Sequence, residues 1–189
     1  PWADLFLPAG ESPYHLGAHH GQEYWNELSL SRNEFIWISR RYDGGVRSTD
    51  TQMNRLWSAL KGRGLLENTI VAVVSDHGES LGERLYLGHR QLYDVQLQVP
   101  WILYLPKMAK PFIMDGALET IDILPTLLDA MGAPQMEGLS GKSIMSALAT
   151  RSAWSEMRPR LSETWARAFR LGPEWKMIMR ETGSQDELY

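Results

Sequence analysis

The sequence predicts an α/β fold, and three features of the chain support that prediction. A helical spacing of apolar residues begins near Ser31 and continues to about Leu60. Two short runs rich in β-branched and aromatic residues follow at 69–74 and 99–105, and a second helical pattern covers 121–131. Helix, strand, loop, strand and helix in this order are typical of a layered α/β domain.

The composition of the 189 residues is that of a globular protein. Hydrophobic residues make up 43% and charged residues 22%, which argues against disorder. The net charge of −4 offers no electrostatic footprint for nucleic acid, and no apolar run reaches the ~18 residues of a bilayer span. We expect no nucleic-acid partner and no transmembrane segment in the chain. Because cysteine is absent, these residues hold no thiolate metal site.

The first sixty residues divide into a loop and a helix. Residues 1–30 are rich in Pro, Gly, His and Trp without periodicity, so we expect them to be mostly loop. The helix begins near Ser31, and Gly44 and Gly45 are expected to bend it. Glycines at 62 and 64 are typical signals for its end.

The two apolar runs predict strands. Residues 69–74 are too few for a helix and rich in β-branched side chains, which is typical of a strand buried on both faces of a parallel sheet. The run 99–105 has the same character, with Pro100 near its entry.

The C-terminal third predicts two short helices and a hairpin. In 121–131, Pro125 fits a first helical turn and Gly132 a left-handed cap, with Leu127, Leu128 and Met131 facing inward. A further short helix is predicted at 141–148, and 175–179 with 187–189 predict strand, turn and strand. We interpret residues 1–189 as one structural unit, with a loop at 1–30, an α/β core portion at 31–150 and a C-terminal hairpin region at 151–189.

The sharpest chemical feature is the segment 75–79, Ser-Asp-His-Gly-Glu, directly after the first predicted strand. Ligands of open parallel α/β sheets bind beyond the carboxyl ends of strands. There, Asp76 and His77 offer a carboxylate and an imidazole to a divalent cation, and Gly78 allows a tight turn behind them. Twelve residues after His77, His89 offers a group that could bind an anion or protonate a leaving oxygen. The residues alone leave open that Asp76 caps a turn and that His89 is an ordinary solvated histidine.

Several motifs in order resemble the C-terminal half of a type I sulfatase. They are found at 42–44, 49–50, 64–71, 75–79, 92–94, 99–100, 120–128, 175–176 and 187–189. The resemblance therefore runs from Tyr42 to Tyr189. It implies an alkaline-phosphatase-like α/β fold, with a mixed, mainly parallel sheet flanked by helices, truncated at its N-terminal side and ending in a small β-hairpin element.

The resemblance also implies a chemistry. The family hydrolyses sulfate esters with a formylglycine and a divalent metal, most often Ca²⁺, with Mn²⁺ and Zn²⁺ as the other possibilities. Asp76 and His77 match two metal ligands of the family. His89 matches the residue that contacts the sulfate and stabilises the leaving group. Arg90 is a weaker candidate for this contact, and a solvated surface charge is the favoured interpretation. The implied substrate is a small-molecule or carbohydrate sulfate ester.

The chain departs from the family pattern in its N-terminal elements. The nucleophile motif Cys/Ser-x-Pro-x-Arg and the N-terminal Asp pair are missing, so only two of the usual four protein metal ligands are present. Glu11 stands where many members have a His before Pro-Tyr; three histidines nearby, His15, His19 and His20, are left out of the site. We expect a segment of a longer protein, with formylglycine supplied upstream. Expressed alone, it should be inactive and prone to self-association.

Two other functions remain open at this point. The segment 75–83 also resembles the motif of phosphoethanolamine transferases and of phosphonate or phosphodiester hydrolases, which transfer phosphoryl groups with zinc or manganese. Alternatively, the chain is a non-catalytic sulfatase-like module in which Asp76 and His77 cap the turn. The leaving group, the oligomeric state and the compartment (periplasmic, secreted or cytoplasmic) stay open.

Overall fold

The computed structural model describes residues 31–89, 91–106, 108, 110–154, 159–163, 166–171, 175–180 and 187–188. The expectations for residues 1–30, Arg90 and Tyr189 lie outside these ranges. The described residues form two compact units, one from 31–69 and 77–98 and one from 70–76 and 99 onward.

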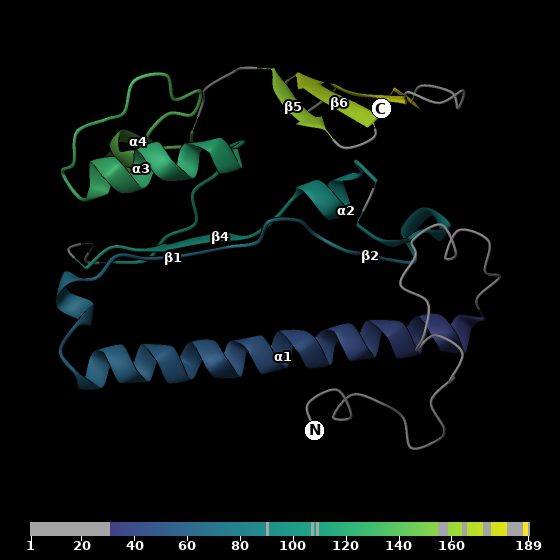
Figure 1. The fold of residues 1–189 in the computed structure, drawn as a ribbon, viewed down its shortest axis with the longest axis horizontal. Helices are drawn as coiled ribbons and strands as arrows, with labels where there is room; N and C mark the ends of the chain where they lie inside the picture. The colour runs from purple at the N-terminus through teal and green to yellow at the C-terminus, as the bar shows by residue number, and fades with distance from the viewer. Residues whose placement is uncertain are drawn as a thin grey trace. The chain divides into compact units, whose positions relative to one another are not determined.

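The first unit contains the long helix α1, Arg32–Gly62 (Figure 1). Ser31 caps its N-terminus: the Ser31 hydroxyl accepts from the Glu34 amide, and the Glu34 carboxylate accepts from the Ser31 amide at 2.7 Å. The predicted start and end of the helix are confirmed. The expected bend is not found, since α1 is continuous through Gly44 and Gly45. Within the described residues, no helix is both long and apolar enough to cross a bilayer.

The rest of the first unit is built from short elements around a two-stranded hairpin. They are η4 Leu66–Asn68, β2 Ser80–Leu81, η5 Glu83–Leu85, β3 Leu87–Gly88 and α2 Asp94–Leu97. β2 and β3 pair antiparallel, with Ser80 opposite Gly88. Helix α1 meets this hairpin at Gly82, where a Cβ atom would lie 2.8 Å from two ring carbons of Phe35. Glycine at this position therefore allows the Phe35 ring to pack against the turn.

The second unit contains the two predicted apolar strands as β1 Val71–Val74 and β4 Trp101–Tyr104. They pair with each other antiparallel, Val71 opposite Tyr104, whereas the apolar run predicts a strand in a parallel sheet. A short apolar run indicates that a strand is buried. It does not indicate whether the neighbouring strand runs parallel or antiparallel, which explains the difference. Burial on both faces is also wrong for the described residues, since the Val74 and Ile102 side chains are exposed.

The helical pattern at 121–131 forms η6 Thr120–Asp122 followed by α3 Ile123–Ala130, and the next helix is α4 Met145–Thr150. Pro125 is buried in the first turn of α3 and Gly132 has φ +68°, as predicted. Met131 is exposed, so the expectation that it faces inward is wrong. The most buried face of α3 carries Pro125 and Thr126, because the segment 141–144 packs there through hydrogen bonds to Thr126 and its neighbours.

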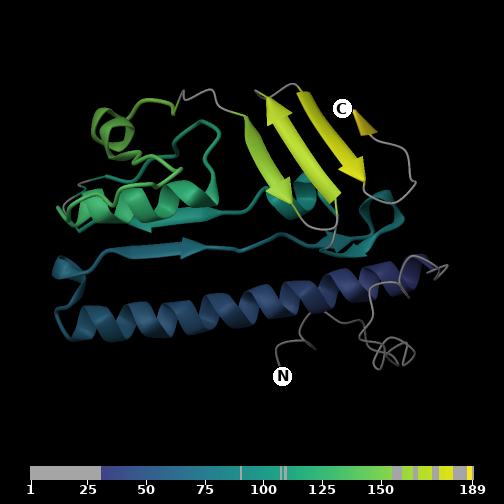
Figure 2. The ribbon, with the colours of Figure 1, turned by 45° about the horizontal axis from the view of Figure 1, so that its top comes forward.

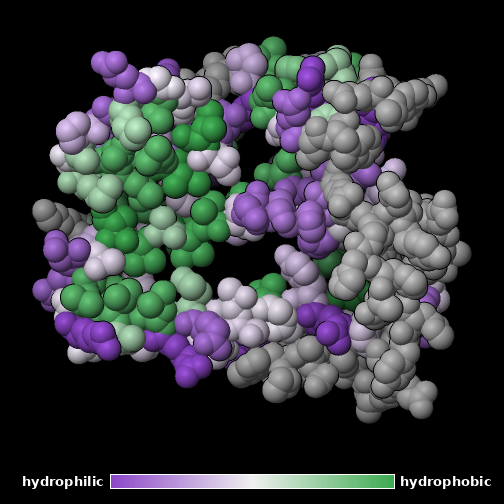
Figure 3. Space-filling model, viewed as in Figure 1, coloured by the Kyte–Doolittle hydropathy of each residue, from purple (hydrophilic) through white to green (hydrophobic). Residues whose placement is uncertain are grey.

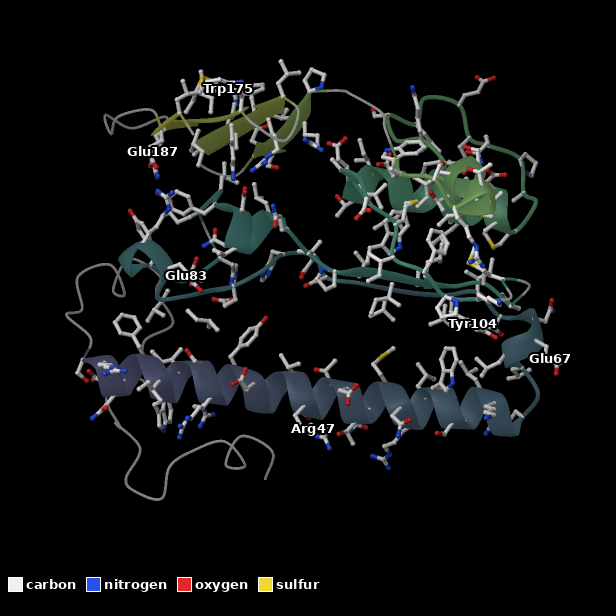
Figure 4. The ribbon with its side chains drawn as sticks, turned by 180° about the vertical axis from the view of Figure 1, so that it is seen from behind. Arg47, Glu67, Glu83, Tyr104, Trp175 and Glu187 are labelled. Carbon is white, nitrogen blue, oxygen red and sulfur yellow. The ribbon has the colours of Figure 1, made fainter. Side chains whose placement is uncertain are left out.

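The C-terminal region is a four-stranded antiparallel sheet in the order β5-β6-β7-β8 (Figure 2). Its strands are Arg160–Glu163, Ala166–Leu171, Trp175–Arg180 and Glu187–Leu188. Figure 4 labels Trp175 on β7 and Glu187 on β8, the two strands that the sequence predicts. β5 and β6 extend the expected hairpin to four strands. The sequence did not predict β6, because charged residues alternate along it with Ala166 and Ala168, which form its buried face.

Hydrophobic residues of the second unit gather over α3, α4 and the β1–β4 pair (Figure 3). Several are well exposed, including Ile113 at 93% and Ile102 at 62%. Exposed apolar side chains of this kind favour association between protein molecules. Self-association of the isolated chain agrees with this exposure but stays a prediction, because it has not been tested.

Candidate active site

The β2–β3 hairpin brings the His89 side chain next to two side chains that lie ten and twelve residues before it in the sequence. His77 and Glu79 precede β2, and His89 follows β3. In an antiparallel pair, the residues just outside opposed positions are themselves opposed. Since Ser80 lies opposite Gly88, Glu79 and His89 are placed to meet.

The hairpin is fixed from within by Gln96 of α2, which is 2% exposed. Its side-chain amide donates to the Ser80 hydroxyl at 2.7 Å and to the Gly88 carbonyl at 3.0 Å, so one side chain joins both strands. The backbone carbonyl oxygen of Gln96 accepts from the backbone amide of Gly78 at 2.7 Å. The bonds at Gly78 and Gly88 fix backbone next to the three clustered side chains, and the bond to the Ser80 hydroxyl holds the side chain of the residue after Glu79.

Gly78 makes this arrangement possible through close backbone approach. A Cβ atom at residue 78 would lie 2.0 Å from the Val95 carbonyl oxygen and 3.0 Å from the Gln96 Cα atom. No side chain larger than hydrogen fits at that distance. The sequence predicts glycine here for a tight turn; the structure gives packing against 95–96 as the reason.

The three side chains form a compact cluster. The Nδ1 atom of His89 lies 2.9 Å from a carboxylate oxygen of Glu79. The rings of His77 and His89 are stacked, with centroids 4.0 Å apart and planes inclined by 21°. One nitrogen of each ring and one Glu79 oxygen lie within 4.8 Å of one another. The cluster therefore presents two imidazoles and a carboxylate on one side of the hairpin.

Both imidazoles have one nitrogen engaged. His77 Nδ1 lies 2.9 Å from the Gly78 carbonyl oxygen, which can only accept, so Nδ1 is the donor. His89 Nδ1 likewise donates to the Glu79 carboxylate. These bonds place the single proton of each neutral ring on Nδ1.

The Glu79–His89 pair is partly solvated, with side-chain exposures of 26% and 47%. An ion pair this accessible contributes about 0–1 kcal/mol to folding. Its main effect is therefore to orient His89, whose ring remains open to solvent.

The remaining predicted site residues are placed as follows. Asp76 is exposed, two residues beyond the end of β1. Its neighbour His77 begins the segment of the first unit that leads into β2. Arg90 lies outside the described residues. Sequence reasoning missed Glu79 as a partner of His89, although the two lie only ten residues apart with Gly82 and Gly88 between them, which was a usable signal for a turn.

The donor types of Asp76 and His77 fit a divalent cation. Carboxylate oxygen is a ligand for Ca²⁺, Mn²⁺ and Zn²⁺, whereas imidazole nitrogen suits Mn²⁺ or Zn²⁺ better than Ca²⁺. A calcium ion would therefore take most of its ligands from groups other than His77. The metal roles of Asp76 and His77 stay a prediction.

Solved structures show which fold the chain has. A phosphonate monoester hydrolase from Silicibacter pomeroyi superposes with a TM-score of 0.74 at 23% identity, over 87% of this chain and 37% of that one. The structure of BT4656 with its substrate D-glucosamine-2-N,6-O-disulfate gives 0.73 at 23% identity, over 88% and 37%. The chain thus has the alkaline-phosphatase-like α/β fold, which confirms the predicted fold class.

The sequence comparisons show to which family the chain belongs. The sulfatase family model matches residues 14–133, and this chain belongs to the sulfatase family. Arylsulfatase K of Danio rerio is 31% identical over 185 residues, which are 87% of this chain and 34% of that protein. Arylsulfatase K of Canis lupus familiaris is 32% identical over 75% of this chain and 27% of its own length. The chain thus spans about a third or less of these relatives.

Proposed function

We propose that the whole protein containing these residues is a sulfatase-type hydrolase, dependent on formylglycine and a divalent metal, that cleaves small-molecule or carbohydrate sulfate esters. The family match carries the proposal, because residues 14–133 include Asp76, His77 and His89. The names of the arylsulfatase K relatives, and the disulfated glucosamine of BT4656, support a sulfated substrate.

Asp76 and His77 are the proposed metal ligands. Their donor types support this role, since the Asp76 carboxylate offers the oxygen ligand that Ca²⁺ prefers and the His77 imidazole offers a nitrogen ligand for Mn²⁺ or Zn²⁺. The ion, Ca²⁺ in the first instance, would neutralise the charge of the bound sulfate group.

His89 is the proposed contact to the ester oxygen. Because Nδ1 donates to Glu79, Nε2 is the atom that can face a substrate. In the imidazolium form of His89 both ring nitrogens carry a proton. Nε2 then donates its proton to the oxygen that leaves as the S–O bond breaks, while the Glu79 carboxylate accepts from Nδ1 and holds the ring in place. The exposure of His89 leaves its ring accessible to a substrate.

The nucleophile belongs to a part of the protein outside this chain. The 189 residues hold no cysteine and no Ser-x-Pro-x-Arg motif, so formylglycine cannot be generated within them. We therefore expect residues 1–189 alone to have no turnover. Robust hydrolysis by the isolated chain would overturn the proposed division of the site.

A phosphoryl-transfer activity is the second candidate. The phosphonate monoester hydrolase with a TM-score of 0.74 is the observation that favours it. The two functions differ in the ester that is hydrolysed fastest, so substrate comparison separates them. The remaining alternative, a non-catalytic module, predicts no hydrolysis of either ester.

The test measures hydrolysis of 4-nitrophenyl sulfate and of a phenylphosphonate ester by the whole protein with Ca²⁺. We expect the sulfate to be preferred, and His89→Ala to lower kcat by about 10²–10⁴-fold, the usual contribution of a proton donor. Asp50→Asn is the matched control, because Asp50 is exposed on α1 and its contact with Arg47 is 3.9 Å long (Figure 4 labels Arg47).

Three results would count against the proposal. Faster cleavage of the phosphonate ester would move the protein to the second candidate. An unchanged kcat for His89→Ala would remove His89 from the site. No hydrolysis of either ester by a folded whole protein would favour the non-catalytic module.

A further inference from the structure

One side of the C-terminal sheet is apolar and exposed. Successive residues of a strand point to opposite sides of a sheet, and burial alternates in this way along β6 and β7. On one side, the side chains of Ala166, Ala168 and Ile178 are at most 3% exposed. The other side carries six large hydrophobic residues that are 37–67% exposed: Leu161, Phe169, Leu171, Trp175, Met177 and Leu188. We call these six residues the apolar face.

The strand register joins the apolar face into a continuous row. Leu161 of β5 lies opposite Phe169 of β6. Phe169 lies opposite Met177 of β7, which in turn lies opposite Leu188 of β8. Directly opposed side chains stand on the same side of a sheet, with Cβ atoms about 4.5–5.5 Å apart. One row of apolar side chains therefore crosses all four strands, and a second opposed pair of the same face lies beside it.

This distribution is the reverse of that in a sheet with one face in water, where the solvated face carries the polar residues. Here the buried side holds Lys176, which is 5% exposed, and the ion pair of Arg180 with Glu187. Figure 4 labels Glu187 of the buried side and Trp175 of the apolar face, which is 58% exposed. Contiguous apolar surface of this kind marks a site where something binds.

The size of the apolar face favours an occupant from the same polypeptide. A stable interface between separate proteins uses about 20–30 residues on each side, whereas this face offers six. A segment of the same polypeptide needs fewer contacts, because its docking costs no translational and rotational freedom of a separate molecule. The chain spans 34% of arylsulfatase K of Danio rerio, so most of that relative lies outside the matched part. A whole protein of similar length has ample polypeptide to supply such a segment.

We propose that the apolar face is an intramolecular docking surface, covered in the whole protein by an apolar segment of the same polypeptide outside residues 1–189. The row spans three strand spacings, or about 14 Å, so the segment needs apolar side chains along about that length. Glu163 and Arg167 form an ion pair at 2.9 Å on the same side of the sheet and border the row. The proposal concerns none of the residues of the proposed active site.

The test replaces Phe169, within the row, by the photo-crosslinking amino acid benzoylphenylalanine in the whole protein. Equal amounts of ¹⁵N-labelled and unlabelled protein are mixed and irradiated, and crosslinked peptides are identified by mass spectrometry. We expect residue 169 to be joined to a peptide from outside residues 1–189 that carries the same isotope label. The same replacement at Asp50, which is polar and exposed on α1, is the matched control and should give far less crosslinking.

A second measurement needs no substitution. Methionine oxidation follows exposure, so peroxide should oxidise Met177 about tenfold or more slowly in the folded whole protein than in the same protein unfolded in guanidinium. This readout holds even if the Phe169 replacement does not fold.

Three results would overturn the proposal. Crosslinks that join only differently labelled molecules would show that a second copy covers the face. Crosslinks only to peptides within residues 1–189 would show that the chain covers its own face. Oxidation of Met177 at the unfolded rate would show that the face is solvated. Because none of these readouts depends on turnover, they are independent of whether the protein hydrolyses a sulfate ester.

Discussion

Two clusters of polar side chains in this chain differ in burial, although each contains a carboxylate that accepts hydrogen bonds. The cluster of His77, Glu79 and His89 lies at the surface, with one nitrogen of each ring engaged by a neighbour and the ring of His89 nearly half exposed. The cluster around Asp122 is buried: Asp122 and Thr126 are each 0% exposed. Both lie in segments that resemble the same family.

The difference lies in how the acceptors are used. Both carboxylate oxygens of Asp122 accept backbone amides, from Glu119 at 3.0 Å and from Lys142 at 2.8 Å. The Thr126 hydroxyl donates to the Asp122 carbonyl at 2.6 Å and accepts from the Ile144 amide at 3.2 Å. A carboxylate saturated by backbone donors holds a loop in place, whereas one that orients an exposed imidazole is placed to act on a ligand. The comparison separates structural from chemical polar groups.

The largest effect that tests this contrast is the loss of the Asp122 carboxylate. Asp122→Ala removes the acceptor of two part-buried backbone amides, at about 1–2 kcal/mol each, so we expect the free energy of unfolding to fall by about 2–4 kcal/mol. Denaturant unfolding of the whole protein measures it. Asp129→Ala is the matched control, because Asp129 lies on α3, which begins directly after Asp122, is exposed, and accepts from the Ser143 hydroxyl. Equal losses for the two variants would contradict a structural role for Asp122.

A smaller effect tests the frame beneath the histidines. Gly78→Ala places a methyl group 2.0 Å from the Val95 carbonyl, so the backbone at 95–96 must move. We expect a loss of about 1–3 kcal/mol in unfolding free energy, the usual cost of overpacking. A lower kcat for sulfate-ester hydrolysis by the whole protein should accompany it, since His77 and Glu79 flank the displaced residue. An alanine variant with unchanged stability and kcat would show that the close approach is not needed.

The smallest effect has the opposite sign. Gly45 lies inside α1, and a Cβ atom there would meet nothing within 4 Å. Gly45→Ala should therefore raise stability by about 0.5–1 kcal/mol, because alanine loses less conformational freedom in a helix. The thermal midpoint measures it. A destabilised variant would mean that the helix needs glycine at this position, as the expected bend required.

The sequence predicts α1 well because local signals determine it. Ser31 and Glu34 form a capping box that holds the N-terminus, and the apolar spacing continues to the glycine at its end. The antiparallel partner of β1 could not be predicted in the same way. Pairing with β4 joins residues about thirty positions apart, and an apolar run carries no information on strand direction.

For the candidate site too, the sequence predicts some features, and others depend on contacts between segments that are distant in sequence. His77 and His89 could be named from residue type and position, since both flank the segment after a predicted strand. Their contact with Glu79 depends on the register of β2 and β3, which Gln96 fixes from a different element. Contacts of this kind, made through a third residue, leave no local pattern in the sequence. The metal roles of Asp76 and His77 stay a proposal.

The most direct test of the account measures two variants of the whole protein side by side. His89→Ala and Asp122→Ala are each assayed for sulfate-ester hydrolysis per folded molecule and for unfolding free energy. The account predicts that His89→Ala lowers kcat by about 10²-fold or more while stability changes by less than about 1 kcal/mol. It predicts that Asp122→Ala lowers stability while the folded fraction keeps its kcat. The reverse pattern, or an equal loss of both quantities in both variants, would contradict it.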